Sequence, residues 1–327
     1  MLAPGSRDLI DVIVTTAPRT AAHPTEPPNA AASGTWQLGD RTVRRLGFGA
    51  MRLTGTGAFH HGTPRDRAAS IAVVRRAVEL GVDHIDTAAF YFSTLRSANE
   101  ILNAALAPFG PDEVLVATKV GPRRDRAGAW EAAARPEDLR GDVEQNLREL
   151  GRDHLDLVYL RNMRWDSLTD HFGALADLRE AGLIRHLGVS GVSTAQLHEV
   201  RAIAPVVSVQ NKFGLDDTAS FELLQACGEL GIAFVPFYAI AGARTEAASA
   251  APDQAAETEQ DRASKVAAAY GVSPQQIRIA WTLSQGPHVL AIPGTGDVAH
   301  LEANIAAGAI RLTPQDLELL AAADTAS

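Results

Sequence analysis

Short apolar runs alternate with amphipathic segments along most of the chain. From Leu46 onward, each run of a few apolar residues is followed by a stretch in which apolar residues recur every three or four positions. The runs are typical of buried strands, and the wider spacing is typical of helices with one face on a core. Eight strands are predicted: Arg45–Met51, His84–Thr87, Val114–Lys119, Leu155–Leu160, His186–Ser190, Val206–Gln210, Ala233–Phe237 and Val289–Pro293.

Glycines stand where the amphipathic segments end. Leu139, Val143, Leu147 and Leu150 fall on one helical face, and Gly151 follows directly. A glycine just past a helix end takes the left-handed backbone conformation without steric cost. The same signal closes four other amphipathic segments, at Gly81, Gly182, Gly231 and Gly271. These glycines therefore predict where five helices end.

The order of the elements predicts the fold class. Strands that alternate with helices form a parallel sheet, because parallel neighbours need a crossover connection. Eight such units predict an α/β fold, a (β/α)₈ TIM barrel. Trp36–Val43, with Gly39-Asp40 at its turn, adds an N-terminal β-hairpin. An open doubly wound sheet is the alternative, but its glycine-rich dinucleotide turn would fall at Gly47–Arg52, which lacks the third glycine.

The chain is expected to consist of a tail and one domain. Residues 1–33 show no periodicity, and Thr16–Ser33 are rich in Ala, Pro and Thr. We therefore expect residues 1–33 to be a disordered tail and residues 34–327 to form a single barrel domain. No apolar run approaches the roughly 20 residues that a membrane helix needs.

The amino-acid composition limits the kinds of binding partner and the cellular compartment that we expect. A net charge of -9 and a pI near 5.6 argue against a nucleic-acid-binding surface. The single cysteine, Cys227, cannot form an internal disulfide, and its apolar helical face indicates a packed thiol. The ten histidines lack metal-ligand spacing. We expect a cytoplasmic protein, a monomer or small homo-oligomer, with no metal, nucleic-acid or membrane partner.

Polar side chains collect at the predicted carboxyl ends of the strands, where barrel enzymes carry their sites. Asp86 and Tyr91 follow the second strand, and Lys119 ends the third. A tyrosine, with an ordinary pKa near 10, is a poor proton donor unless a nearby cation favours the phenolate. Lys119 could supply that charge, and Asp86 could keep Lys119 protonated. These residues predict a phenol tuned to protonate a developing alkoxide.

Several short segments, in this order and spacing, resemble the aldo-keto reductase superfamily from Trp36 to Asp324. They are Leu46–Met51, His84–Ala88 with Tyr91, Ala117–Lys119, Gly188–Ser190, Val209–Asn211, and Ile292–Thr295 followed by His300–Glu302 and Asn304. The resemblance implies a barrel opened by an N-terminal hairpin. It also implies an NAD(P)H cofactor bound in an extended pose, and reduction of a small-molecule aldehyde or ketone.

The resemblance assigns expected roles to residues of this chain. Tyr91 would be the proton donor, with Lys119 and Asp86 as its tuning pair. Ser190 and Gln210 would hydrogen-bond the nicotinamide carboxamide. The other expected cofactor contacts are Ala50, Met51, Phe237, Gly294, Thr295, Gly296, His300 and Asn304.

Arg161 is the first of four departures from the family pattern, because it stands where the family has a histidine after the fourth strand. A guanidinium could still orient a carbonyl oxygen or favour the phenolate. We therefore expect Arg161 to be catalytic. Because an arginine cannot act as a general base, we also expect reduction to be favoured over oxidation.

The other departures concern the cofactor. Gly191 replaces the asparagine of the usual Ser-Asn pair, and Ala303 replaces a glutamate near the adenine. Gly294 and His300 replace basic residues of the 2′-phosphate site. NADPH is the expected cofactor, with NADH possible.

A narrower resemblance points to a substrate. Phe59–Arg67, Thr118–Arg124, Leu160-Arg161 and Phe234–Phe237 resemble the bacterial pyridoxal-reductase-like branch. Pyridoxal, reduced to pyridoxine, is the specific guess. Candidate pocket-lining residues are Phe48, Phe59, Phe92, Trp165 and Tyr238. The alternative, motivated by Arg161, is an NADP(H)-binding regulatory or redox-sensing barrel with little turnover.

Overall fold

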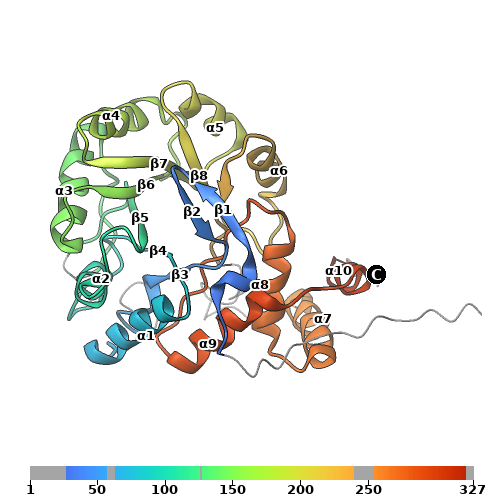
Figure 1. Ribbon diagram of the computed structural model, residues 1–327. Helices are drawn as coiled ribbons and strands as arrows, with labels where there is room; N and C mark the ends of the chain where they lie inside the picture. Colours follow the sequence, from blue (N-terminus) through green and yellow to red (C-terminus); the bar gives the residue numbers. More distant parts are fainter. Residues whose placement is uncertain (1–26, 57–62, 126, 239–253, 322–327) are drawn as a thin grey trace, which may run out of the picture.

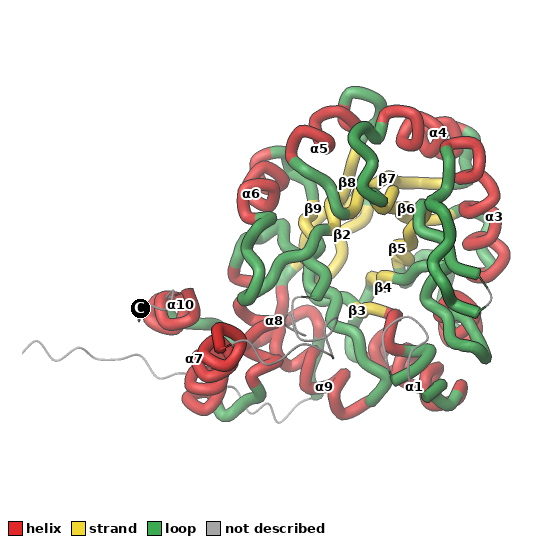
Figure 2. Tube along the Cα trace, turned by 180° about the vertical axis from the view of Figure 1, so that it is seen from behind, coloured by secondary structure: helices red, strands yellow, loops and turns green. Residues whose placement is uncertain are grey.

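The computed structural model describes residues 27–56, 63–125, 127–238 and 254–321, with only the backbone given for 254–261. A parallel sheet curls into a ring, and helices surround it (Figures 1 and 2). Sequence neighbours are also spatial neighbours, in the order β3-β4-β5-β6-β7-β8-β9. The strands are β3 Phe48–Gly49, β4 His84–Asp86, β5 Leu115–Val120, β6 Leu155–Arg161, β7 Ile184–Ser190, β8 Val206–Gln210 and β9 Ala233–Phe234. The parallel α/β fold predicted from the sequence is confirmed.

Helices cover the outer face of the ring. They are α1 Arg67–Glu79, α2 Ala98–Leu106, α3 Leu139–Leu150, α4 Thr169–Glu180, α5 Thr194–Arg201, α6 Phe221–Glu229, α7 Gln254–Tyr270, α8 Pro274–Ser284, α9 Val298–Ala306 and α10 Pro314–Ala321. Short 3-10 turns are η1 Ala30–Ser33, η2 Ala50–Arg52, η3 Pro136–Asp138 and η5 Ala307–Ala309. The five predicted helix-end glycines all have positive φ, between 65° and 86°.

The eighth predicted strand forms bridges rather than a continuous ladder. The N–H of Phe234 donates to the carbonyl of His288 at 2.9 Å, and the N–H of Leu290 donates back to Phe234. On its other side, Ala291 bridges Leu46. Gly49 N of β3 donates to Pro293 O at 3.3 Å, so the segment 288–293 bonds to both edges of the seven-stranded sheet. Pro293 has no N–H to extend this ladder.

The first predicted strand is shorter than Arg45–Met51. Only Phe48 and Gly49 pair as a strand with β4, and Ala50–Arg52 turn into η2. The carbonyl of Ala50 accepts from Leu53 N at 3.0 Å, which turns the chain away from the sheet. Met51 and Arg52 thus lie on a turn at the carboxyl end of β3.

Two short strands, β1 Thr35–Leu38 and β2 Arg41–Arg44, pair antiparallel at the opposite end of the ring (Figure 1). Their buried side chains Leu38 and Val43 join a cluster from the inside of the ring, with Leu115, Leu157, Tyr159, Ala233, Val235 and Leu290. These strands cover the amino ends of the parallel strands. The carboxyl ends are left for a site.

The expected tail overlaps the folded body. Ala30 N donates to the carbonyl of Leu80 at 2.9 Å, and Leu46 N donates to Ser33 Oγ at 3.0 Å. Asn29 caps η1 by accepting from Ala31 N. Residues 29–33 are therefore hydrogen-bonded to the body, while residues 1–26 lie outside the described part of the chain.

Three smaller features bear on function. Cys227 is fully buried on α6, and burial raises the pKa of its thiol to about 12, as expected of a packed cysteine.

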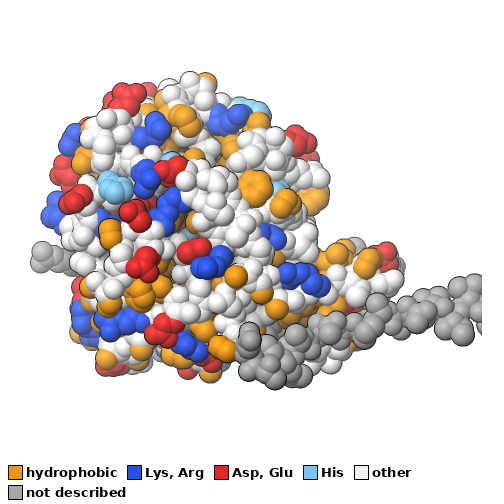
Figure 3. Space-filling view, viewed as in Figure 1, with side chains coloured by type: hydrophobic (Ala, Val, Ile, Leu, Met, Phe, Trp, Pro, Cys, Tyr) orange, Lys and Arg blue, Asp and Glu red, His pale blue; other side chains and the backbone are white. Residues whose placement is uncertain are grey.

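Among the described residues, no helix has the length and apolar character needed to cross a membrane. On the face seen in Figure 3, Lys and Arg side chains lie among Asp and Glu side chains rather than in one basic patch.

Candidate active site

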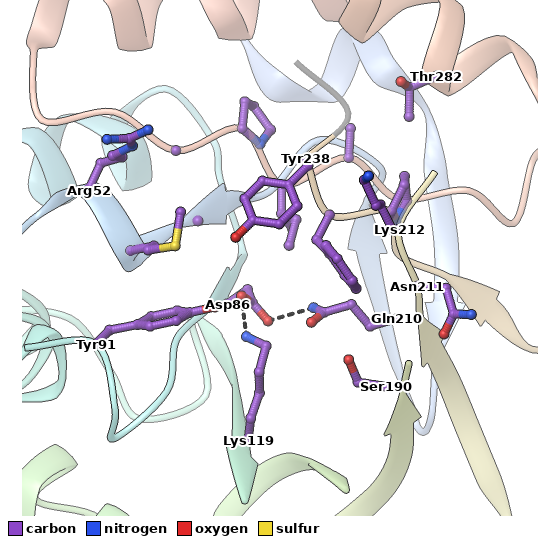
Figure 4. A pocket seen from close by; sticks show the side chains of 18 of the residues that line it. Arg52, Asp86, Tyr91, Lys119, Ser190, Gln210, Asn211, Lys212, Tyr238 and Thr282 are labelled. Carbon is purple, nitrogen blue, oxygen red and sulfur yellow. Dashed lines mark hydrogen bonds and ion pairs between the residues drawn. The ribbon is translucent and has the colours of Figure 1, made fainter. Parts of the chain in front are cut away.

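A cavity of about 1230 Å³ opens at the carboxyl ends of the parallel strands. All four residues predicted to be catalytic line it, namely Asp86, Tyr91, Lys119 and Arg161. Figure 4 shows Asp86, Tyr91 and Lys119 converging from neighbouring strand ends. Because these strands are parallel neighbours, their carboxyl-terminal side chains meet at one end of the sheet.

Asp86 and Lys119 form a buried ion pair. Lys119 Nζ donates to Asp86 Oδ1 at 2.6 Å and to the carbonyl of Thr87 at 3.0 Å. Gln210 Nε2 donates to the other carboxylate oxygen at 2.8 Å (Figure 4). Burial lowers the pKa of Lys119, and the Asp86 charge opposes that shift. Lys119 is thus a cation held in a dry site by one carboxylate.

Tyr91 lies on the turn that leads from β4 to α2. The turn is fixed by Tyr91 N donating to Ala88 O at 3.0 Å, and by Ala98 N donating to Tyr91 O at 2.7 Å. Lys119 Nζ sits 4.9 Å from the centre of the Tyr91 ring. The phenol and the ammonium are therefore neighbours, as the strand-end pattern predicted.

The pKa of Tyr91 lies well above its ordinary value. Burial is the largest cause, the Asp86 charge adds to it, and Arg161 acts in the opposite direction. The expected lowering by a nearby cation is thus outweighed, because burial disfavours the phenolate and Asp86 repels it. Tyr91 remains a protonated donor at neutral pH.

Arg161, at the end of β6, lies over the cavity. Its Nη1 donates to Ser190 Oγ at 3.1 Å, and its guanidinium carbon is 4.8 Å from the centre of the Phe237 ring. A side chain on Gly191 would begin 2.7 Å from the same Nη1. Arg161 therefore occupies space that the glycine leaves open.

The two predicted carboxamide ligands both have protein partners. Gln210 donates to Asp86, and Ser190 accepts from Arg161. Asn211, which directly follows β8, accepts from Gly191 N at 2.9 Å and donates to Val192 O at 2.8 Å. The Ser190-Gly191 turn is thus held by Asn211 and Arg161, an arrangement that no local sequence signal predicts.

The predicted adenosine end lies where residues 293–297 lead into α9. Gly294 packs so closely on Gly49 that a Cβ would lie 2.6 Å from the Gly49 carbonyl oxygen. Thr295 Oγ1 accepts from Asp297 N at 3.1 Å, and the side chain of His300 is 80% exposed. Met51, Phe237, Gly294, Thr295, His300 and Asn304 line the cavity, together with Ser190 and Gln210.

Two predicted cofactor contacts are not among the lining residues. Ala50 is the first residue of η2 and is fully buried. Gly296 is packed against the side chain of Arg65. Neither position has room to present a side chain to a ligand in the cavity.

The charge of the cavity suits an anionic dinucleotide. Arg52, Arg161 and Lys212 line it, although the chain as a whole carries a net charge of -9. Asp86 is the carboxylate among the lining residues, and Lys119 already neutralises it. Lys212 is itself paired with Asp217 at 3.1 Å. The charge of Arg52 and Arg161 therefore remains to favour phosphate groups. The residues therefore fit a nicotinamide dinucleotide that extends from Tyr91 towards α9.

The predicted aromatic lining is only partly correct. Tyr238 lines the cavity, while Phe48 is buried outside it and Phe59 lies outside the described residues. Trp165 instead stacks on His171 at 3.9 Å, and Phe92 lies under Arg124 at 4.5 Å. Both therefore brace loops at the carboxyl ends of the strands.

Phe90, Trp130 and Met163 are among the apolar lining residues that sequence reasoning missed. Phe90 directly precedes Tyr91, so the catalytic motif could have indicated it. Trp130 and Met163 belong to loops after β5 and β6, and only the fold brings them to the cavity.

The profile of the aldo/keto reductase family matches residues 45–325. The chain belongs to the aldo/keto reductase family. As a member, it is an NAD(P)H-dependent oxidoreductase. The structure and the cavity described above agree with this assignment, and the resemblance seen in the sequence is confirmed.

One characterised protein and two solved structures illustrate what the chain is similar to. The chain is 39% identical to pyridoxine 4-dehydrogenase of Escherichia coli strain K12, over 88% of this chain and 98% of that protein. A thermostable aldo-keto reductase solved with the inhibitor epalrestat is 26% identical, with a TM-score of 0.72, over 88% of this chain and 98% of the other. A Klebsiella pneumoniae aldo-keto reductase solved with NADPH is 25% identical, with a TM-score of 0.69, over 88% and 93%.

Proposed function

We propose that this aldo/keto reductase reduces a small aldehyde or ketone to the alcohol with NADPH, and that pyridoxal is a substrate. The observation that carries the proposal is the buried Lys119–Asp86 pair, at 2.6 Å, beside the Tyr91 ring. The E. coli relative, named pyridoxine 4-dehydrogenase, supports the choice of pyridoxal.

Each residue has a distinct part in the reaction. A nicotinamide held in this cavity would supply the hydride for the carbonyl carbon. Tyr91, which is protonated at neutral pH, donates its proton to the carbonyl oxygen. Lys119 stabilises the phenolate that is left. Asp86 holds Lys119 in place, and Gln210 in turn holds the carboxylate of Asp86.

Arg161 takes the place of the family histidine in this proposal. Its guanidinium is fixed by Ser190 and Phe237 at the cavity wall. A permanent cation at this position stabilises negative charge that develops on the substrate oxygen. Because arginine cannot accept a proton at neutral pH, the site favours reduction over oxidation.

We also propose that the fold is the complete eight-stranded barrel closed by a hairpin. Support comes from residues 288–293, whose backbone bonds to both edge strands, and from the paired strands β1 and β2. A closed ring brings Thr295, Asn304 and Tyr91 to the same end of the sheet, where all three line the cavity.

The proposal is tested by mixing purified protein with NADPH and a panel of carbonyls that includes pyridoxal, and following the loss of cofactor absorbance. We expect turnover that falls at least about 100-fold in Tyr91→Phe, since a positioned proton donor contributes on that scale. Tyr270→Phe is the control, because its hydroxyl bonds Asp316 away from the cavity. Tight NADPH binding without turnover of any carbonyl would instead support a regulatory or sensing role, which family membership does not favour.

A further inference from the structure

We propose that Trp130 and Phe90 form an aromatic wall that stacks on the ring of the substrate, so that the enzyme selects flat aromatic aldehydes. The inference rests on the proposed function, because it names the substrate class of the same cavity. It assigns specificity to a loop after β5 rather than to the catalytic residues themselves.

Hydrogen bonds hold the described residues of the loop that carries Trp130. Arg124 and Trp130 face each other in an antiparallel bridge, and Asp125 N donates to Ala129 O at 3.0 Å. Arg124 Nε donates to Gly128 O at 2.9 Å, and its Nη1 donates to Phe90 O at 2.9 Å. The last bond ties the loop to the turn that positions Tyr91. The indole is therefore presented at a fixed place relative to the proton donor.

Aromatic rings form a continuous series from the proton donor to this loop. The Phe90 and Tyr91 rings meet edge to face, with centres 5.1 Å apart. On its other side, Phe90 lies 5.8 Å from the Trp130 ring at 58°. Since Phe90 is only 8% exposed, it is a packed spacer between the two outer rings. A carbonyl at Tyr91 would thus have its attached group directed along Phe90 and Trp130.

Trp130 presents a solvent-exposed face to the cavity, and a ligand could cover this face. It lines the cavity, yet 52% of its surface is exposed to solvent. Large apolar area left in water is unfavourable, and a flat ring buries more of an indole face than a short alkyl chain can. Arg124 lies 5.4 Å from the Trp130 ring and 4.5 Å from the Phe92 ring, and so braces the indole.

The chemistry of the wall separates aromatic from aliphatic aldehydes. An aromatic aldehyde can place its ring against Trp130 while its carbonyl reaches Tyr91. Met163, also on the lining and 36% exposed, adds a polarisable side chain that suits an aromatic partner. A short aliphatic aldehyde can use the same proton donor but leaves the indole in water. Selectivity should therefore depend on Trp130, while basal reduction should not.

The experiment compares kcat/KM for pyridoxal and benzaldehyde with that for propanal, in the wild type, Trp130→Leu and Trp130→Phe, with saturating NADPH. We expect Trp130→Leu to lower kcat/KM for both aromatic aldehydes about tenfold, mainly through KM, and to change propanal by less than about twofold. Trp130→Phe should keep most of the aromatic preference. Phe221→Leu is the control, because Phe221 is 43% exposed on α6 and is not a lining residue.

Binding is measured separately by titrating pyridoxine into protein saturated with NADPH, a combination that cannot react because both partners are reduced. Trp130→Leu should raise the Kd of pyridoxine about tenfold. Equal losses of kcat/KM for aromatic and aliphatic aldehydes in Trp130→Leu, or an unchanged Kd for pyridoxine, would overturn the proposal that Trp130 stacks on the substrate ring. Absence of turnover in the wild type would overturn the proposed function instead, and the pyridoxine titration would still decide the role of Trp130.

Discussion

A Cβ on Gly191 would lie 2.7 Å from Nη1 of Arg161 and 3.1 Å from its guanidinium carbon. Two departures from the family pattern are therefore one structural unit. The family asparagine at position 191 would occupy the place of the guanidinium. The glycine permits Arg161 to reach Ser190, and the chain needs both substitutions together.

Gly191→Asn tests this coupling. Gly191 has a φ of 71°, which asparagine tolerates better than most residues, so the backbone should hold. The new side chain should push the flexible guanidinium away from Ser190 and lower kcat about tenfold, with a smaller change in NADPH affinity. Arg161→Ala should have a similar effect, and the double variant should lose little more.

Gly182→Asn is the matched control, because Gly182 has a φ of 79° and no atom within 4 Å of its Cβ position. It carries the same backbone strain without touching Arg161. If Gly191→Asn keeps wild-type kcat, or if Gly182→Asn loses as much, position 191 is not coupled to turnover through Arg161.

The pH dependence of kcat should be set by Lys119. Its pKa is lowered from the ordinary value of 10.5, so the ammonium loses its proton as the pH rises through that lower value. Turnover should then fall, because the phenolate of Tyr91 loses its neighbouring cation. The pKa of Tyr91 is raised, so the tyrosine keeps its proton in this range.

Asp86→Asn should move the alkaline fall in kcat to lower pH, because the Asp86 charge and hydrogen bond are what raise the pKa of Lys119 against burial. The measurement is a profile of kcat against pH with saturating substrate. An alkaline limb that stays in place would show that another group controls it.

Buried amides behind the site should contribute to stability. Asn146 Oδ1 accepts from Thr118 Oγ1 at 2.6 Å and from Asn99 Nδ2 at 3.0 Å, and Asn99 in turn accepts from Thr87 at 2.9 Å. Thr87 and Thr118 directly adjoin Asp86 and Lys119 in the chain.

Asn146→Ala leaves buried donors without their acceptor and should destabilise the fold by about 1–3 kcal/mol. Urea unfolding followed by circular dichroism measures the loss. Gln145→Ala, at an exposed position on the same helix α3, should change stability by less than about 0.5 kcal/mol. Comparable losses in the two variants would mean that the amide network does not account for the effect, and the higher helix propensity of alanine would not explain a loss at either position.

The choice of cofactor should depend on His300. Its exposed ring stands in the first turn of α9, where backbone N–H groups favour a phosphate, and Asp297 Oδ1 is 3.9 Å from Nδ1. His300→Ala removes the imidazole and leaves the carboxylate, so NADPH should lose affinity about fivefold while NADH changes little. Fluorescence titration gives both Kd values. His198→Ala, on α5, is the control, and a wild-type preference for NADH would exclude a 2′-phosphate site at His300.

The sequence by itself determined the elements and their order. Short apolar runs and apolar spacing of three or four residues depend on local geometry, so most of the strands, the amphipathic helices and the five glycine helix ends could be predicted from the local sequence. The same logic predicted that Asp86 and Lys119 would meet, because adjacent parallel strands end at the same edge of a sheet.

Only the tertiary structure decided which side chains of the site contact one another. Gln210 is 124 residues from Asp86 along the chain, yet the two side chains are bonded. The raised pKa of Tyr91 reflects burial by many parts of the fold, and Trp130 reaches the cavity because a loop folds back on Arg124. Such contacts depend on distances between segments that no local pattern encodes, and the packing of Arg161 against Gly191 is one of them.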